Sequence, residues 1–426
     1  MVSLGIVTLG CSKNTVDSEV LAAGVAQGRV KVYFDTFPRV DAVVINTCGF
    51  IGDAKAESID AVLQALEWKR SGRVGQVFVM GCLVERFAEQ LHLELPEVDG
   101  FFGVTDYHRV LKALKQKPLP KGSTQRVLST PPHYAYLKIS EGCDRKCSFC
   151  AIPFIRGPQR SRTIRSLLDE ARFLADKGVK ELNLIAQDTT VYGIDLYGKR
   201  RLADLLGQLA GLNLFHWIRL HYTFPSGFPT EVLKVMAKHP SICKYIDIPL
   251  QHINDGILHS MKRGATASST RKLLDRIRRE LPGVSIRTAF IVGYPGETRA
   301  RFTELLRFVE EQRFERLGVF TYSPEEGTAA FRMKETVTER TKHSRAAELM
   351  ALQQQISLEI NQRRVGSDLE VIIDRREKDH YIGRTEFDSP EVDNEVVVSS
   401  SKHLKDGSFY KINITGAEEF DLYGRI

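Results

Sequence analysis

The sequence has no apolar run long enough to cross a membrane and no recognisable targeting segment. A spanning helix needs roughly 20 consecutive apolar residues, and no stretch of the 426 residues approaches that length. Residues 1–10 contain no Lys or Arg and no cleavage-site pattern, so we expect no signal peptide and a cytoplasmic location. The balance of 42% hydrophobic and 27% charged residues is typical of a soluble chain with about two to four domains.

Cysteine is scarce, with seven residues in the whole chain. In a reducing cytosol, cysteines at regular positions suggest metal binding or catalysis rather than disulfides. The net charge of +7 is only a mild excess of basic residues. It permits an RNA or ribosomal partner without requiring one.

The first third of the sequence alternates between short β-branched runs and segments with apolar residues at helical spacing. This alternation predicts an α/β domain over residues 1–120, built on a parallel, doubly wound sheet. Its expected strands are 5–10, 41–46 and 77–80, and its expected helices are 17–26, 53–69 and 84–92. Residues 115–132, which are rich in Pro, Lys, Gly, Ser and Thr, predict a linker.

The alternation resumes over residues 133–362, where about six strand–helix units predict an open or partial β/α barrel. The expected strands are 135–139, 181–186, 217–221, 245–248, 285–291 and 316–320, with helices such as 166–177 and 268–281 between them. A long amphipathic segment, 336–364, leads into the last domain. Residues 363–426 have short alternating runs at 369–373, 395–398 and 409–414, which predict a small antiparallel β-barrel of about five strands.

Three cysteines stand close together after the first expected barrel strand. Cys143, Cys147 and Cys150 have the spacing C-x3-C-x2-C, which on one loop can hold three irons of a cubane 4Fe-4S cluster. The fourth iron then has no protein ligand, and an open metal position permits substrate binding. A zinc site is the alternative, but structural zinc needs four N or S ligands, and the nearest other candidate is Asp144.

This motif resembles the radical S-adenosylmethionine superfamily. The resemblance implies that the amino and carboxylate groups of S-adenosylmethionine chelate the open iron. Reductive cleavage then gives methionine and a 5′-deoxyadenosyl radical, so the three cysteines, here called the radical-site cysteines, act in catalysis through the cluster. Phe149 matches an aromatic residue common in the superfamily, although packing alone also explains it.

Three more cysteines, here called the auxiliary cysteines, each follow an expected strand: Cys11, Cys48 and Cys82. Because the carboxyl ends of parallel strands share one edge, we expect these thiols to converge at one site. The alternative is three buried structural cysteines, since free cysteine is often buried. Cys243 has no cysteine near it in sequence, and we interpret it as structural.

The three-part organisation and the auxiliary cysteines resemble the methylthiotransferase family along the full chain. That family combines an N-terminal domain holding a second 4Fe-4S cluster, a radical barrel and a C-terminal TRAM domain. The resemblance implies that the auxiliary cysteines hold an auxiliary cluster carrying the sulfur to be inserted. It also implies two uses of S-adenosylmethionine, as methyl donor and as radical source.

The family has one branch that modifies adenosine next to the tRNA anticodon and another that modifies the β-carbon of an aspartate in small-subunit ribosomal protein twelve. Residues 10–19, 150–162 and 383–393 resemble the second branch. Residues 365–426 carry 14 Asp and Glu against 8 Lys and Arg, a net of −6, whereas the remaining residues carry +13. Lys and Arg strengthen binding to the phosphates of a nucleic acid, so an acidic last domain is poorly suited to bind tRNA. Its charge instead favours a basic protein partner. A merely solvated acidic surface is the alternative.

Other candidates follow barrel strands, at the edge where such folds place their active sites. Gln187, Asp188, Gln251 and Gly293 are candidates for binding S-adenosylmethionine, the glycine because it would admit the cofactor closely. His252 is equally well explained as a buried, hydrogen-bonded histidine.

Arg156, Arg160 and Arg162 follow the cysteine loop, where they either attract a carboxylate of the substrate or cofactor or form a solvated basic face. We expect the partners to be a small-subunit ribosomal protein and an electron donor such as flavodoxin or ferredoxin, without a membrane. Two rival functions stay open: a tRNA adenosine methylthiotransferase, and a non-catalytic iron–sulfur or RNA-binding protein.

Overall fold

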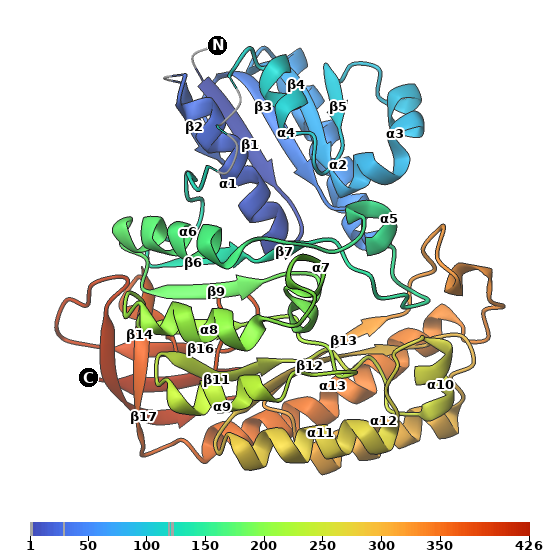
Figure 1. Cartoon of the computed structure of the whole chain (residues 1–426), viewed down its shortest axis with the longest axis vertical. Helices are drawn as coiled ribbons and strands as arrows, with labels where there is room; N and C mark the ends of the chain where they lie inside the picture. The colour runs from blue at the N-terminus through green and yellow to red at the C-terminus, as the bar shows by residue number, and fades with distance from the viewer. Residues whose placement is uncertain (1–2, 29, 118–119, 121–122) are drawn as a thin grey trace.

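The computed structural model describes residues 3–28, 30–117, 120 and 123–426. Four residues of the expected linker, 118, 119, 121 and 122, lie outside the described residues, as do residues 1, 2 and 29. Figure 1 shows the N-terminal sheet (blue) above a second sheet (green to orange), with a small closed barrel (red) at the side of the latter. The predicted α/β class is confirmed.

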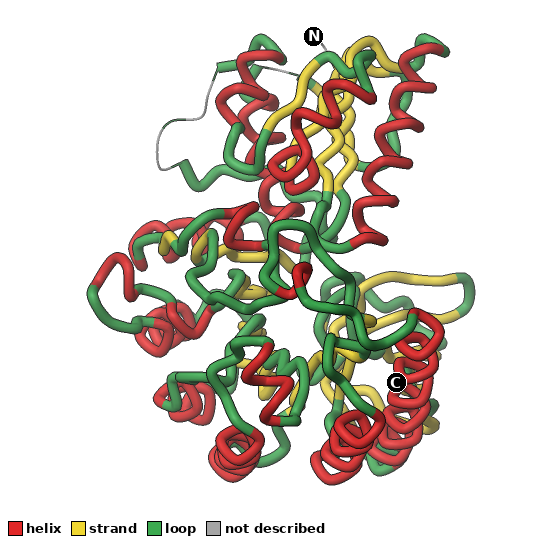
Figure 2. The backbone as a smooth tube through the Cα atoms, turned by 90° about the vertical axis from the view of Figure 1, so that its right-hand side faces the viewer, coloured by secondary structure: helices red, strands yellow, loops and turns green. Residues whose placement is uncertain are grey.

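The N-terminal sheet has the strand order β2-β1-β3-β4-β5, and its strands pair in parallel. Helices cover both of its faces (Figure 2), and each face has its own apolar core. The predicted doubly wound sheet is therefore confirmed. The elements are β1 (Ser3–Thr8), α1 (Ser12–Ala26), β2 (Lys31–Phe34), β3 (Val40–Thr47), α2 (Gly52–Arg70), β4 (Val74–Gly81), α3 (Cys82–Glu94), β5 (Gly100–Phe102) and α4 (Tyr107–Ala113).

Several elements of this domain differ from expectation. Helix α1 begins at Ser12, five residues before the predicted start. The prediction missed this first turn because it has no apolar period, and its Asn14 is buried through hydrogen bonds to the carbonyls of Leu9 and Thr47. Strands β2 and β5 and helix α4 were not predicted. Each is short, and β2 and β5 lie at the two edges of the sheet.

The second sheet has the strand order β13-β12-β11-β10-β9-β6 and is also parallel. Its two edge strands, β6 and β13, do not pair, so the predicted partial barrel is confirmed. The strands are β6 (Tyr134–Lys138), β9 (Glu181–Ile185), β10 (Trp217–Leu220), β11 (Ile242–Asp247), β12 (Ser285–Val292) and β13 (Arg316–Thr321). The covering helices are α6 (Ile164–Asp176), α8 (Leu202–Gly211), α9 (Glu231–Lys238), α11 (Ala267–Glu280) and α12 (Arg299–Gln312).

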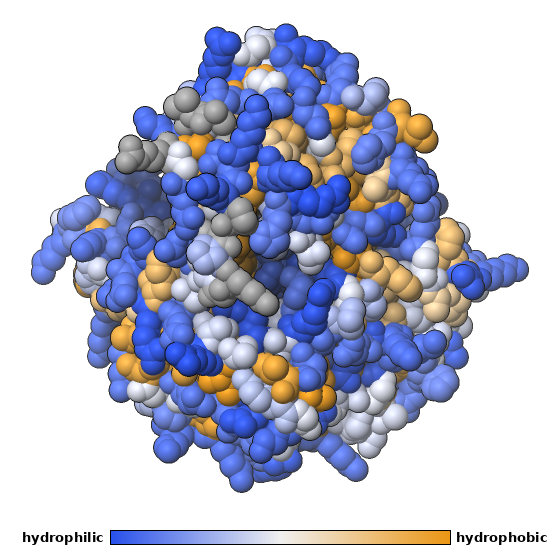
Figure 3. All heavy atoms as spheres, turned by 45° about the horizontal axis from the view of Figure 1, so that its top comes forward, coloured by the Kyte–Doolittle hydropathy of each residue, from blue (hydrophilic) through white to orange (hydrophobic). Residues whose placement is uncertain are grey.

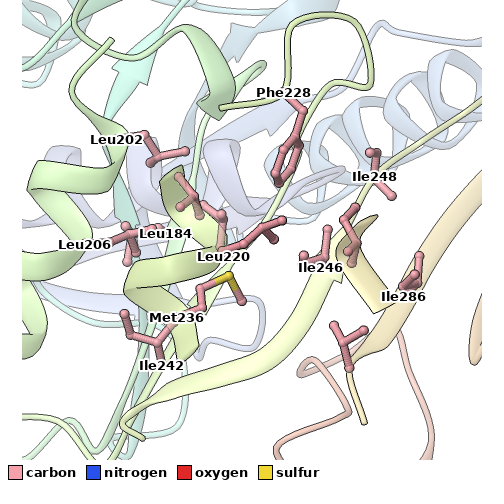
Figure 4. Packing of buried hydrophobic residues seen from close by; sticks show 14 of the residues in the cluster. Leu184, Leu202, Leu206, Leu220, Phe228, Met236, Ile242, Ile246, Ile248 and Ile286 are labelled. Carbon is pink, nitrogen blue, oxygen red and sulfur yellow. The ribbon is translucent and has the colours of Figure 1, made fainter. Parts of the chain in front are cut away.

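Apolar side chains of the strands and helices form one continuous core between the two layers (Figure 4). Leu184, Leu220 and Ile246 of the strands pack with Leu206 and Met236 of the helices, all almost wholly buried. Four helices begin after a threonine whose hydroxyl accepts a backbone N–H hydrogen bond, which satisfies a donor of the first turn. These caps are Thr163, Thr266, Thr298 and Thr338.

Short elements complete the barrel region. They are β7 (Ser140–Glu141), α5 (Ile152–Arg156), β8 (Arg160–Ser161), η1 (Thr189–Val191), α7 (Ile194–Tyr197), α10 (Asp255–Ser260) and η2 (Ala330–Arg332). The predicted long amphipathic segment is α13 (Glu339–Gln362). Its Gln353 donates to the carbonyl of Phe314 in the barrel, and its Asn361 donates to the carbonyl of Glu418 in the last domain, both at 2.9 Å.

The last domain is a closed barrel of five strands in the order β14-β15-β16-β18-β17. The strands are β14 (Asp368–Glu377), β15 (His380–Arg384), β16 (Glu395–Ser399), β17 (Phe409–Ala417) and β18 (Asp421–Arg425). Four pairings are antiparallel as expected, whereas β16 and β18 pair in parallel.

One loop of this domain, the inserted loop (residues 385–394, between β15 and β16), reaches into the open barrel. It contacts side chains of β6, β10, β11, β12 and β13, including the first residue of three of these strands. Its partners in the barrel are Tyr134, Arg219, Tyr245, Ser285 and Arg316. The loop therefore enters from the end opposite the carboxyl edge of the strands, and it fastens the last domain to the barrel.

The surface is mostly hydrophilic, with apolar groups in scattered patches on the face that Figure 3 presents. Within the described residues, no helix is both long and apolar enough to cross a bilayer.

Candidate active site between two groups of cysteines

The radical-site cysteines lie on the loop from β7 to α5, beyond the carboxyl end of β6. The loop closes on itself through the N–H of Cys150, which donates to the carbonyl of Cys147 at 3.2 Å. Cys143, Cys147 and Cys150 lie close enough to influence one another electrostatically. The preceding Gly142 has φ +78°, and a Cβ there would collide with the carbonyl of Pro158, so this tight approach requires glycine.

Two arginines supply hydrogen bonds to these sulfur atoms. The backbone N–H of Arg145 donates to Sγ of Cys143, and the guanidinium of Arg263 donates to Sγ of Cys147, both at 3.4 Å. Burial raises the pKa of Cys143 to about 11 and that of Cys150 to about 12. A thiolate here needs nearby positive charge, which metal coordination and the two donors would provide.

The auxiliary cysteines gather at the carboxyl edge of the N-terminal sheet. Cys11 follows β1, Cys48 follows β3 and Cys82 begins α3 directly after β4, and these three strands are neighbours. The three thiols influence one another electrostatically, and burial raises the pKa of Cys82 to about 12. Gly10, with φ +89°, permits the approach, because a Cβ there would lie 2.7 Å from Cβ of Cys48.

The two groups of cysteines face each other across the junction of the two domains. Cys82 packs in one apolar cluster with Ala151, the residue directly after Cys150. The guanidinium of Arg156, from the radical-site side, donates to Oδ1 of Asn14 at 2.6 Å and lies 3.7 Å from Sγ of Cys82. The structure thus brings together six cysteines that the sequence distributes over 140 positions.

A buried network of charges surrounds this junction. Arg156 donates to Asp17 at 3.1 Å and to Glu141 at 3.0 Å, and Lys138 donates to the same two carboxylates. The hydroxyl of Tyr107 donates to Asp17 at 2.6 Å. Burial alone would raise the pKa of Glu141, but Lys138 and Arg156 lower it to about 2.

Three family models match consecutive parts of the chain. They describe an uncharacterized protein family, UPF0004, over residues 3–103, the radical SAM superfamily over residues 137–309 and the TRAM domain over residues 365–426.

Curated relatives match the chain from end to end. Ribosomal protein uS12 methylthiotransferase RimO of Flavobacterium psychrophilum is 52% identical over 99% of this chain and 97% of its own length. The proteins of the same name from Chloroherpeton thalassium and Phocaeicola vulgatus are 50% and 48% identical, and each match covers at least 98% of the relative. The chain belongs to the RimO family. The predicted family and its ribosomal-protein branch are thereby confirmed, and the tRNA branch is not favoured.

Solved structures share the fold at low identity. The radical S-adenosylmethionine methyltransferase TsrM of Kitasatospora setae has a TM-score of 0.56 at 14% identity, and the alignment covers 86% of this chain and 76% of TsrM. The cobalamin-dependent enzyme OxsB has a TM-score of 0.52 at 14% identity, covering 84% of this chain and 62% of OxsB. These likenesses support the architecture of the RimO-family chain, not its substrate.

Two of the predicted cofactor residues lie beside the radical-site loop. Nε2 of Gln187 donates to Glu141 at 2.6 Å, whereas its Oε1 is buried without a hydrogen-bond partner among the described residues. Such an orphaned acceptor is expected where a ligand completes a site. Asp188 is buried, and it accepts from Nε of Arg145 at 2.7 Å.

The other predicted cofactor residues have different surroundings. Phe149 packs against an apolar cluster that includes Tyr294 and Tyr322. Gln251 has φ +74°. Its N–H donates to the carbonyl of Ala289 in β12, and its carbonyl accepts from the N–H of Ile291 in the same strand. A Cβ at Gly293 would lie 2.3 Å from Cγ of Lys342, and the N–H of Gly293 donates to Glu297 at 3.0 Å, so packing already explains this glycine, and its role toward a cofactor stays a prediction.

The remaining candidates divide between structural and charged roles. His252 is fully buried between Glu297 and the N–H of Asn254, as an ordinary hydrogen-bonded histidine. Arg162 pairs with Glu170 at 2.6 Å, and Arg160 is exposed. Cys243 lies in a buried cluster with Trp217, Tyr245 and Ile372, away from the two groups of cysteines.

Sequence reasoning did not single out several side chains at the junction, among them Asp17, Glu141, Arg145 and Arg263. The signal for Glu141 and Arg145 was their place within two residues of Cys143. Arg263 carried no such signal, because it reaches the loop from 116 residues away.

Proposed function

We propose that this chain transfers a methylthio group to the β-carbon of an aspartate in ribosomal protein uS12. The observation that carries the proposal is the pair of three-cysteine groups facing each other between the two sheets, with Cys82 and Ala151 in one buried apolar cluster. Relatives about 50% identical over nearly their full length carry the name of this activity. We further propose that residues 1–120, 133–362 and 363–426 form the three domains.

The donor chemistry fits two 4Fe-4S clusters, one on the radical-site cysteines and one on the auxiliary cysteines. Each group offers three thiols, and arginine donors lie within 3.4 to 3.7 Å of the sulfur of Cys147 and Cys82, as expected around cluster sulfurs. Structural zinc takes four N or S ligands, whereas each group offers three cysteine thiols, so the donor set disfavours zinc.

The chain's own residues bind and orient the reactants around these groups. When bound, the clusters and S-adenosylmethionine supply the sulfur, the methyl group and the radical chemistry that removes hydrogen from an unactivated carbon. We propose that Phe149, Gln187, Asp188 and Gln251 line the S-adenosylmethionine site. The free Oε1 of Gln187 is suited to accept a hydrogen bond from the cofactor. Val104, Ala151 and Ile155 form a buried apolar cluster with Cys82, which limits water beside that thiol.

The charge argument for the substrate weakens once the fold is known. Six of the 14 acidic residues in the last domain contact barrel residues or Arg384, which itself pairs with Glu181; they are Glu370, Asp374, Glu386, Asp388, Glu391 and Asp393. This leaves eight acidic and seven basic residues, a net of −1 in place of −6. The remaining surface is therefore close to neutral, and the substrate assignment rests on the full-length relatives.

The deciding experiment offers the reconstituted enzyme two substrates, uS12 and tRNA. We expect a mass increase on one aspartate of uS12 and no methylthioadenosine in tRNA. Dithionite and flavodoxin or ferredoxin would be compared as electron donors, in keeping with the cytoplasmic setting we propose. Methylthioadenosine without modified aspartate would contradict the proposal, and absence of 5′-deoxyadenosine would favour a non-catalytic iron–sulfur protein.

A further inference from the structure

Lys13 is a buried cation without a partner of opposite charge. The residue is only 6% exposed and stands two positions after Cys11, in the first turn of α1. Among the residues that the structure describes, its ammonium makes no ion pair and no hydrogen bond. The ammonium lies over the ring of Tyr222, whose centroid is 3.0 Å from Nζ. A buried charge left in this way is costly unless a ligand completes the site.

The other cations near the cysteines are already engaged. Arg156 and Lys138 share Asp17 and Glu141. Arg145 pairs with Asp188, and Arg263 donates to Cys147 and to the carbonyl of Pro249. Lys13 is thus the buried cation of the junction whose charge is available to an anion.

Tyr222 places Lys13 between the two halves of the active site. The tyrosine follows β10 at the carboxyl edge of the barrel, where its N–H donates to Oδ2 of Asp247 at 3.0 Å and its φ is +55°. An aromatic face holds an ammonium without neutralising it. The ring of Tyr222 therefore holds the ammonium of Lys13 two residues from Cys11, on the side that faces the barrel.

We propose that Lys13 binds the carboxylate of the substrate aspartate. This inference rests on the proposed function, in which the reacting carbon is bonded directly to that carboxylate. An aspartate brought between the two cysteine groups must bury its negative charge within two bonds of the reacting carbon, and a buried carboxylate needs a cation. Lys13 lies beside an auxiliary cysteine, so an ion pair there directs the β-carbon toward the site that supplies the sulfur.

The test is a cycle of enzyme and substrate variants. Wild type, K13M and K13R are each given uS12 with Asp or with Asn at the modified position. Methionine keeps the length and apolar stem of lysine and removes only the charge. We expect K13M to lose about 10- to 100-fold in kcat/KM on the Asp substrate, the usual effect of a charged hydrogen bond. The preference for Asp over Asn should shrink by the same factor in K13M and survive in part in K13R.

Binding gives a second readout that needs no turnover. Fluorescence anisotropy of labelled uS12 should show a weaker Kd of K13M for the Asp form and little change for the Asn form. The exposed Lys177, replaced by Met, is the matched control and should leave both preferences unchanged. An unchanged Asp-to-Asn preference in K13M would overturn the inference.

Three further measurements separate the alternatives. Iron content, the electron paramagnetic resonance spectrum and substrate-free release of 5′-deoxyadenosine should match wild type in K13M. A loss in any of these would assign Lys13 to a cluster or to S-adenosylmethionine and overturn the inference. If wild type itself leaves uS12 unmodified, the proposed function fails, and that result differs from a K13M enzyme with unaltered selectivity.

Discussion

Arg156 and Asn14 join the two groups of cysteines through a hydrogen bond of 2.6 Å. Asn14 is itself fixed, because its amide donates to the carbonyls of Leu9 and Thr47 at the ends of β1 and β3. Arg156 ends α5, six residues after Cys150. The position of one site relative to the other is therefore set by a buried polar contact rather than by apolar area alone.

Replacing Arg156 by Gln should destabilise the junction by about 3 kcal/mol, because the change removes the positive partner of the buried Asp17 and Glu141. Lys138 continues to pair with both carboxylates and limits the loss. Thermal unfolding monitored by circular dichroism measures the effect. The control is Arg172→Gln, which breaks an exposed pair with Asp169 and should cost less than about 0.5 kcal/mol. Equal losses from the two variants would show that the junction does not depend on this contact.

The cysteine groups make a prediction about iron content. Replacing one radical-site cysteine by Ala should reduce iron in the reconstituted protein from about eight to about four atoms per chain, and replacing one auxiliary cysteine should do the same. The remaining cluster should differ between the two classes of variant in its electron paramagnetic resonance spectrum.

Cys243 is the matched control for this experiment. It is fully buried, and burial raises its pKa to about 12. Cys243→Ala should keep all of the iron and lose only packing. Loss of all iron in every single-cysteine variant would contradict two independent clusters.

The sequence predicted the inner strands of the N-terminal sheet, the strands of the second sheet and the gathering of the cysteines, because these signals are local or periodic. Strand-to-loop turns at Cys11, Cys48 and Cys82 lie far apart in sequence, yet the parallel topology brings them to one edge. The first turn of α1 had no such signal, because Lys13 is buried against the ring of Tyr222 and Asn14 through hydrogen bonds to backbone carbonyls.

The inserted loop could not be predicted from any periodic pattern. The segment 383–393 resembles a motif of the last domain, but its residues contact barrel strands that lie between 72 and 257 residues earlier in the sequence. Charged side chains in a turn-like segment normally indicate solvent exposure. Here each charge meets a partner on another domain, and sequence alone does not reveal that partner.

The pair between Asp388 and Arg316 should fasten the inserted loop to the barrel. Both side chains are at least 95% buried, and Asp388 also accepts a hydrogen bond from Thr385. Asp388→Asn leaves the buried guanidinium without its counter-charge and should cost about 3 to 5 kcal/mol. Chemical denaturation measures the loss, and Asp406→Asn, at an exposed turn, should change stability by less than about 0.5 kcal/mol. If the two variants unfold alike, the loop is not held by this ion pair.

Asp374 should make the protein sensitive to acid. Burial would raise its pKa, but Arg384 and His133 lower it to about 2, below the value of roughly 3.9 expected for an unfolded chain. A carboxylate with a lowered folded pKa contributes stability above the unfolded value, and this contribution is lost as the pH falls from about 4 to about 2. The shift corresponds to about 2 kcal/mol, and the side chain is only 11% exposed, so solvent screening is small. Wild type should therefore exceed Asp374→Asn in the free energy of unfolding at pH 6, and the difference should shrink when both are measured at pH 3. A difference that stays constant over this range would mean that Asp374 stabilises the protein through packing, not through its charge.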